Sequence, residues 1–145
     1  MSCEALGRII NVQSAMDNVY VNLRDVGGIA VVGFLTGGAG DTYTVTEAKT
    51  SGGGSAQVLA TVTTYYTNTG NGTDAWTKHT QAAASTVVAA AAATQNQVLF
   101  HIFPEELSDT YKYVKVARTG AGTVTIIQYD HQVQRAPANQ PAIGV

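Results

Sequence analysis

The feature that most constrains the fold is a repeated pattern of short runs rich in Val, Thr and Tyr, separated by clusters of Gly, Asn and Asp. β-Branched and aromatic residues favour strands, and the separating residues favour turns. In Asp41–Glu47 the even positions are all Thr, whereas Tyr43 and Val45 occupy the other face. Val19–Asp25 alternates in the same way. A period of two residues indicates half-buried strands.

The same criteria predict four further strands, which are Arg8–Gln13, Ile29–Leu35, Gln57–Thr67 and Gln97–Phe103. The run Ile29–Leu35 is apolar at odd and even positions alike, which is typical of a central strand covered on both sides. Gln57–Thr67 reads as one long strand with Val58, Val62 and Tyr66 on a shared face.

Two hairpins are predicted from the turn residues. The first spans Tyr65 to Trp76, and its Asn71-Gly72 pair favours a type I′ turn. The second joins strands at 110–118 and 123–134 around Thr119–Gly122.

Three segments lack the strand pattern. The Ala-rich stretch 82–93 is compatible with a short helix, or with close packing against a neighbouring backbone. Residues 104–109 begin with Pro and two acids, which favours a single helical turn. Residues 135–145 contain two prolines, which exclude them from a sheet interior.

These elements predict an all-β chain that folds as a single-domain β-sandwich or jelly roll with an extended C-terminal arm. The length of 145 residues suits one domain. We expect about eight to nine strands over residues 1–134, since sandwiches and jelly rolls contain that number. The arm is residues 135–145, and we expect it to have no fold of its own.

Charge and cysteine content exclude several classes of protein. Charged residues are 12 % of the chain, about half the usual fraction, and the net charge is −2. This composition provides no basic surface for nucleic acid or an anionic membrane. The single cysteine, Cys3, cannot form a disulfide within the chain. No apolar run is long enough to span a membrane, and the N-terminal residues do not resemble a secretion signal, so folding in a cytoplasm is expected.

No catalytic, metal or cofactor site is predicted. The three histidines, His79, His101 and His131, belong to three different predicted strands, and no serine or cysteine accompanies them in a nucleophile motif. We expect His101 on a sheet face, and the other two pointing to solvent. The neighbours Asp130 and His131 point to opposite faces of a strand and cannot ligate one metal together. The glycine clusters at 37–40 and 52–54 lack the Lys-Ser/Thr of a phosphate-binding loop.

Three aromatic residues near the first hairpin leave two interpretations open. Tyr65, Tyr66 and Trp76 could provide a surface for stacking sugars, which would make the protein a carbohydrate-binding module. Cross-strand and core packing is the commoner role of such residues.

Three segments resemble small structural proteins of tailed bacteriophages, in particular head decoration (cement) or minor capsid proteins. They are Asp41–Lys49 with the Gly-rich loop after it, the run 111–125, and the ending 134–141. The resemblance implies a non-enzymatic, cofactor-free β-sandwich or jelly roll, often trimeric, that binds the major capsid protein on the outside of the shell. It also implies a location in the virion after assembly in the cytoplasm of the bacterial host. A phage tail tube or fibre component is the alternative.

The low charge fits this expectation, because the centres of protein interfaces are depleted of charge. The arm offers candidate partner contacts, which are Arg135, Pro137, Asn139, Pro141 and Ile143.

Overall fold

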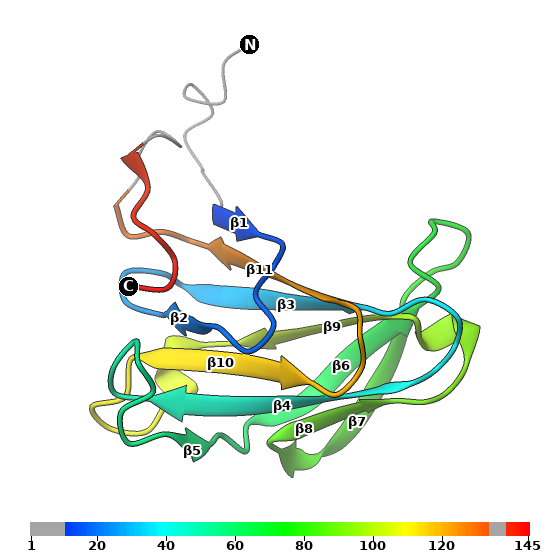
Figure 1. Cartoon of the computed structure of the whole chain (residues 1–145), viewed down its shortest axis with the longest axis horizontal. Coiled ribbons are helices and arrows are strands. Elements are labelled where there is room, and N and C mark those ends of the chain that lie inside the picture. The colour runs from blue at the N-terminus through cyan, green and yellow to red at the C-terminus, as the bar shows by residue number, and fades with distance from the viewer. Residues whose placement is uncertain (1–10, 134–138) are drawn as a thin grey trace.

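The computed structural model describes residues 11–133 and 139–145, which form two antiparallel sheets facing each other (Figure 1). The strands of sheet A, in spatial order, are β1 (Asn11–Gln13), β11 (Thr123–Tyr129), β3 (Gly28–Phe34), β9 (Gln97–Ile102), β6 (Val62–Asn68) and β7 (Thr77–Ala84). The strands of sheet B are β2 (Tyr20–Asn22), β10 (Tyr113–Arg118), β4 (Asp41–Ala48) and β5 (Gln57–Val58), with β8 (Thr86–Ala89) also paired to β4. The predicted all-β sandwich is confirmed.

The strand pairing follows the plan of a jelly roll. Four nested antiparallel pairs, β1–β11, β2–β10, β3–β9 and β4–β8, fold the chain into one long hairpin. The hairpin is rolled so that successive strands join different sheets. β1 and β3 lie in sheet A, and β2 and β4 lie in sheet B. The returning strands β8 to β11 alternate between the sheets in the same way. This arrangement of eight strands in two sheets defines a jelly roll. The strands β5, β6 and β7 lie at the far end of the long hairpin, where β6 and β7 widen sheet A.

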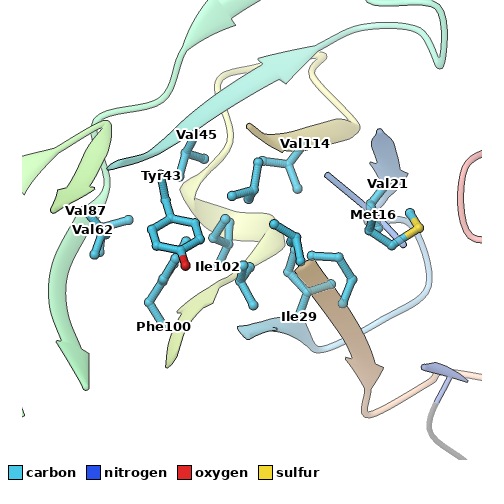
Figure 2. Close-up of a cluster of buried hydrophobic side chains, with 14 of the residues drawn as sticks. Met16, Val21, Ile29, Tyr43, Val45, Val62, Val87, Phe100, Ile102 and Val114 are labelled. Atoms are coloured by element: carbon cyan, nitrogen blue, oxygen red, sulfur yellow. The ribbon is translucent and has the colours of Figure 1, made fainter. Parts of the chain in front are cut away.

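The core lies between the sheets and is built largely from alternate residues of β3, β4, β8, β9, β10 and β11 (Figure 2). Tyr43 and Phe100 are its largest members, with their rings edge to face at 6.3 Å. A side chain at Gly33 would overlap the ring of Tyr43, so glycine is required at this position of β3. Each buried aliphatic side chain contributes about 1.5–3 kcal/mol, and the core therefore supplies most of the stability.

The long strand predicted for Gln57–Thr67 was wrong. The chain leaves sheet B after β5 and enters sheet A at β6, with Leu59–Thr61 between them. Val58 is 63 % exposed on sheet B, whereas Val62 is 3 % exposed in the core, so these two residues do not share a face. The alternation changes phase across the crossing, since Leu59 and Val62 are both buried although one is odd and the other even.

The second predicted hairpin was also wrong. β10 belongs to sheet B and pairs with β4 and β2, whereas β11 belongs to sheet A and pairs with β3 and β1. The turn at 119–122 therefore carries the chain from one sheet to the other. Two amphipathic strands joined by a tight glycine turn can form either a hairpin or a crossing between two sheets. Here β10 pairs with β4 and β11 pairs with β3, so the crossing forms.

The first predicted hairpin is confirmed, since β6 and β7 pair with Thr67 opposite Thr77. Its turn is not of type I′, because that type needs a positive φ at both central residues and Asn71 lacks one. The loop is wider and is held by side chains instead. The Asn71 side-chain oxygen accepts the Thr73 N–H at 3.0 Å, and the Asp74 carboxylate accepts the Thr69 N–H at 3.1 Å.

The Ala-rich stretch is mainly extended. It comprises the end of β7, all of β8 and the start of the 3-10 turn η2 (Ala93–Gln95), so the helical alternative does not occur. Val87 and Ala89 of β8 point into the core. The predicted helical turn after residue 103 is confirmed as the 3-10 helix η3 (Pro104–Glu106), where the Glu106 carboxylate accepts the Phe103 N–H at 2.8 Å.

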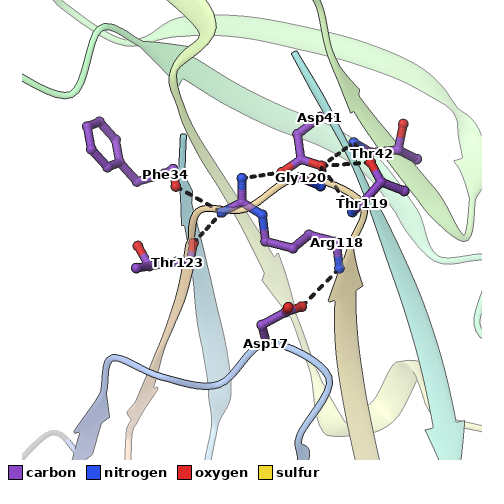
Figure 3. Close-up of polar contacts among 8 residues, drawn as sticks. All are labelled: Asp17, Phe34, Asp41, Thr42, Arg118, Thr119, Gly120 and Thr123. Carbon is purple, nitrogen blue, oxygen red and sulfur yellow. Dashed lines mark hydrogen bonds and ion pairs between the residues drawn. The ribbon is translucent and has the colours of Figure 1, made fainter. Parts of the chain in front are cut away.

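One buried ion pair closes an end of the sandwich (Figure 3). Arg118, at the end of β10, pairs with Asp41 at the start of β4. The same guanidinium donates to the carbonyls of Phe34 and Thr123 in sheet A, each at 2.8 Å. A side chain at Gly122 would overlap both the Phe34 carbonyl and the guanidinium. The two sheets are therefore joined through one cation.

The C-terminal segment does not extend away from the domain as an arm. Residues 139–145 lie beside β2 (Figure 1), where the Asn22 N–H donates to the Ile143 carbonyl at 2.8 Å. Ile143 is 7 % exposed and belongs to the core. As predicted, the segment is not part of a sheet, but the role of Ile143 as an exposed partner contact was wrong. Arg135 and Pro137 lie outside the described residues.

The docked C-terminal segment leads to a first prediction. Ile143→Ala should lower the free energy of unfolding by about 2–5 kcal/mol, because it removes a buried side chain and leaves a cavity. Val145→Ala is the matched control, since Val145 is 65 % exposed and should change stability little. Chemical denaturation followed by circular dichroism measures both. Equal stability of the two variants would contradict the assignment of Ile143 to the core.

The ion pair leads to a second prediction. Arg118→Met should destabilise the domain by about 3–5 kcal/mol, because Asp41 is left buried without its cation. Arg24→Met is the control, since Arg24 is exposed. Denaturation curves of Arg118→Met, Asp41→Asn and the double variant should show strong non-additivity. Additive losses would mean that the two side chains do not act as a unit.

Candidate interaction surface

The outer face of sheet A carries a central group of apolar side chains, and no described strand or helix packs across it, although Gly70 of the loop after β6 lies against Phe34 at one end. Inner positions of its strands are buried in the core, so the alternate positions face outward. The outward residues define what we call the apolar face: Val12, Thr123, Thr125, Ile127, Tyr129, Gly28, Ala30, Val32, Phe34, Gln97, Leu99, His101, Thr64, Tyr66, Lys78 and Thr80. Ile29–Leu35 was predicted to be covered on both sides; on its outward side Ala30 is 7 % exposed, whereas Val32 and Phe34 are half-buried.

The register places the apolar side chains of this face in contiguous rows. Val32 of β3 lies directly opposite Leu99 of β9, at the centre of the sheet. Thr125 is opposite Val32 on one side, and Tyr66 is opposite Leu99 on the other. Directly opposite residues in antiparallel strands have Cβ atoms about 4.5–5.5 Å apart, so the row forms a continuous surface.

The outer face of sheet B is mixed, with threonines and a lysine beside the exposed Val58 and Val88, which lie opposite Thr46 and Thr42. Thr42, Thr44 and Thr46 occupy the outward positions of β4, opposite the core residues Tyr43 and Val45. On the neighbouring β10, Lys115 lies outward with its ammonium 4.9 Å from the ring centre of Tyr20. An antiparallel sheet with one face in water normally has such polar residues on that face.

Charge is nearly absent from the apolar face. Lys78, on the edge strand β7, is its one charged strand residue. His101 lies on this face, as predicted, and burial lowers its pKa from the ordinary value, which keeps it neutral at pH 7. Its Nδ1 is 3.1 Å from the Tyr129 hydroxyl, and its ring stacks parallel to that of Phe103. The strand residues of the face therefore carry a single charge, but at its aromatic end burial and the nearby carboxylates of Asp130, Glu105 and Glu106 raise the pKa of Tyr129.

The three candidate sugar-stacking residues do not share one surface. Tyr65 and Tyr66 are adjacent on β6 and point to opposite faces of sheet A. The ring of Tyr65 stacks on His79 at 4.8 Å, and its hydroxyl donates to the Val88 carbonyl at 3.3 Å. Tyr66 belongs to the apolar face, and Trp76 is 41 % exposed in the loop before β7. His79 is thus packed and bonded to Thr67, which corrects the prediction that it points to solvent.

The buried acids are held by structural contacts. Glu47, at the end of β4, accepts the Ser108 N–H at 2.8 Å and the Gln57 side-chain N–H at 2.6 Å. Burial would raise the pKa of Glu47, but these bonds and one from the Ser108 hydroxyl lower it below the ordinary value. Neither Glu47 nor Asp41 was predicted to be buried. Both lie at odd-numbered positions of β4, as Tyr43 does. This alternation in the sequence was the feature that could have indicated their burial.

Within 11–133 and 139–145, no group of three or more His, Cys, Asp or Glu side chains is placed to hold a metal ion. The same residues include no helix of the length and hydrophobicity needed to cross a membrane.

The contacts of Glu47 lead to a prediction about pH. A carboxyl whose pKa is lowered on folding adds stability above its unfolded pKa of about 4, and this stability is lost as the pH falls through the folded pKa. Glu47→Gln should therefore be less stable than the wild type at pH 7, and the difference should shrink below pH 4. Denaturation curves between pH 3 and pH 7 test this, with exposed Glu105→Gln as the control. If Glu47→Gln were less stable than the wild type by the same amount at pH 3 and at pH 7, the prediction would be wrong.

Comparison with known proteins gives no family. No protein-family model, curated protein or solved structure matches the chain. The resemblance to phage decoration proteins therefore stays a prediction, and functional inference rests on the apolar face and the fold that presents it.

Proposed function

We propose that this protein is a non-enzymatic structural protein of a phage virion, which binds subunits of the major capsid protein and stabilises the shell. The observation that carries the proposal is the outer face of sheet A, where half-buried apolar side chains meet at the centre and no described strand or helix packs across them. Large exposed apolar patches on soluble proteins mark sites of interaction with other macromolecules. A protein with such a face is suited to work as part of an assembly.

The fold and the composition support the same function. Jelly rolls are frequent among viral capsid domains, although they also occur in lectins and other proteins, so the fold alone is an analogy. Charged residues form 12 % of the chain. A freely exposed monomer normally needs more charge to remain soluble, whereas a subunit of an assembly hides much of its surface.

A repeated shell also favours weak individual contacts. Many copies of a decoration protein bind one shell, and a self-associated decoration protein can bind several capsid subunits at once. Simultaneous binding raises the total affinity by a factor of about 10²–10⁴ without any additional kind of contact. We therefore expect the protein to be a homo-oligomer, with the major capsid protein as its second partner.

The test uses the full-length protein and phage heads that lack it. We expect the protein to sediment with the heads at a fixed, saturable number of copies, and to raise the temperature at which the heads disassemble. Heads already saturated with unlabelled protein are the control for non-specific adhesion.

Three other results would overturn the proposal. Failure to bind heads together with saturable binding to tails would make the protein a tail component. Failure to bind either structure would exclude a virion role. Saturable quenching of Trp76 fluorescence by a glycan, absent in Trp76→Ala, would identify a carbohydrate-binding module instead.

A further inference from the structure

We propose that the apolar face binds the same face of a second copy of the chain, giving a two-fold dimer in which two jelly rolls meet through their A sheets. The inference rests on the proposed function in one respect, that the protein works within an assembly. It assigns an occupant to the open face and leaves the other surfaces for contact with the capsid.

The absence of charge on the face restricts the chemistry of its partner. A charged group on the partner would be buried against apolar side chains without a counter-ion, which is strongly unfavourable. The partner surface must therefore be neutral and largely apolar. The same face of a second copy meets this requirement, and its one charged strand residue, Lys78, lies on the edge strand rather than at the centre.

The size of the face matches that of a stable dimer interface. Six strands spaced about 4.8 Å apart span about 29 Å, and seven residues at about 3.3 Å each span about 23 Å. The product is roughly 670 Å² of flat area, close to the roughly 800 Å² that each partner buries in a standard interface. Without β6 and β7 the sheet would be four strands wide and would lose about a third of this area.

The centre of the face is its best-suited part for a two-fold contact. In a face-to-face dimer the same patch of both copies meets at the axis. The middle strands of the six are β3 and β9, and their opposed residues Val32 and Leu99 are both aliphatic. A dry aliphatic centre is the arrangement found in stable interfaces, whose charged residues lie at the rim. A three-fold assembly would instead join two different patches, and so would not bring this face against itself.

The test places opposite charges at the predicted centre. Leu99 points outward, so Leu99→Lys and Leu99→Glu should keep the fold. Analytical ultracentrifugation of the wild type should give twice the 15.1 kDa mass of the chain. Each variant alone should weaken self-association at least tenfold. An equimolar mixture of the two should restore the dimer, because Lys and Glu then meet at the axis. Thr44→Lys, outward at the middle of β4, is the matched control and should leave the dimer unchanged.

The outcomes separate this inference from the proposed function. A wild type that is monomeric at tens of micromolar, or that is a trimer, overturns the dimer, as does dimerisation unaffected by either Leu99 variant. If the wild type is monomeric and Leu99→Lys fails to bind heads, the face binds the capsid and only the inference is wrong. A dimer that never binds heads supports the inference and refutes the virion role. Circular dichroism and thermal unfolding of each variant show that loss of association is not loss of the fold.

Discussion

The arrangement of the two sheets depends on one buried cation. Arg118 ends β10 in sheet B, yet its guanidinium bonds to two carbonyls of sheet A and to Asp41 at the start of β4. Burial would raise the pKa of Asp41, but N–H groups of the turn at 119–122, the Thr119 hydroxyl and the Arg118 charge lower it. Asp41 and Arg118 neutralise each other, which offsets part of the cost of removing both charges from water. The crossing from β10 to β11 is therefore fixed at the point where a hairpin would otherwise be able to form.

This crossing determines how the long hairpin is rolled. Because β10 and β11 lie in different sheets, the nested pairs alternate between sheets, and the outermost strands β1 and β11 end at one side of sheet A. The inserted strands β6 and β7 then extend sheet A on its other side. Sheet A becomes six strands wide, and Val32 and Leu99 come to lie at its centre. The width and the composition of the apolar face are thus consequences of the fold rather than of any single motif.

The low charge of the chain fits the proposed assembly, because the centres of protein interfaces are depleted of charge. The outer face of sheet B has threonines of β4 beside the exposed Val58 and Val88. The neutral outer face of sheet A is suited to contact with a surface of the same kind. A face-to-face dimer would present two B sheets outward and leave the loops at both ends for further contacts, which is a useful geometry for a protein that bridges subunits of a shell.

Alternation along the chain determined the strands and which side of each strand is buried. It placed Tyr43 and Val45 on one face of their strand, and it marked 29–35 as apolar on both faces, as expected for a central strand. Only the tertiary structure decided which sheet each strand joins, that Gln57–Thr67 is divided between two sheets, and that Ile143 returns to the core beside Asn22. The physical reason is that a period of two residues records inward and outward positions but not partners. Partners are set by contacts between distant residues, such as Asn11 opposite Gln128, for which a single sequence contains no local signal.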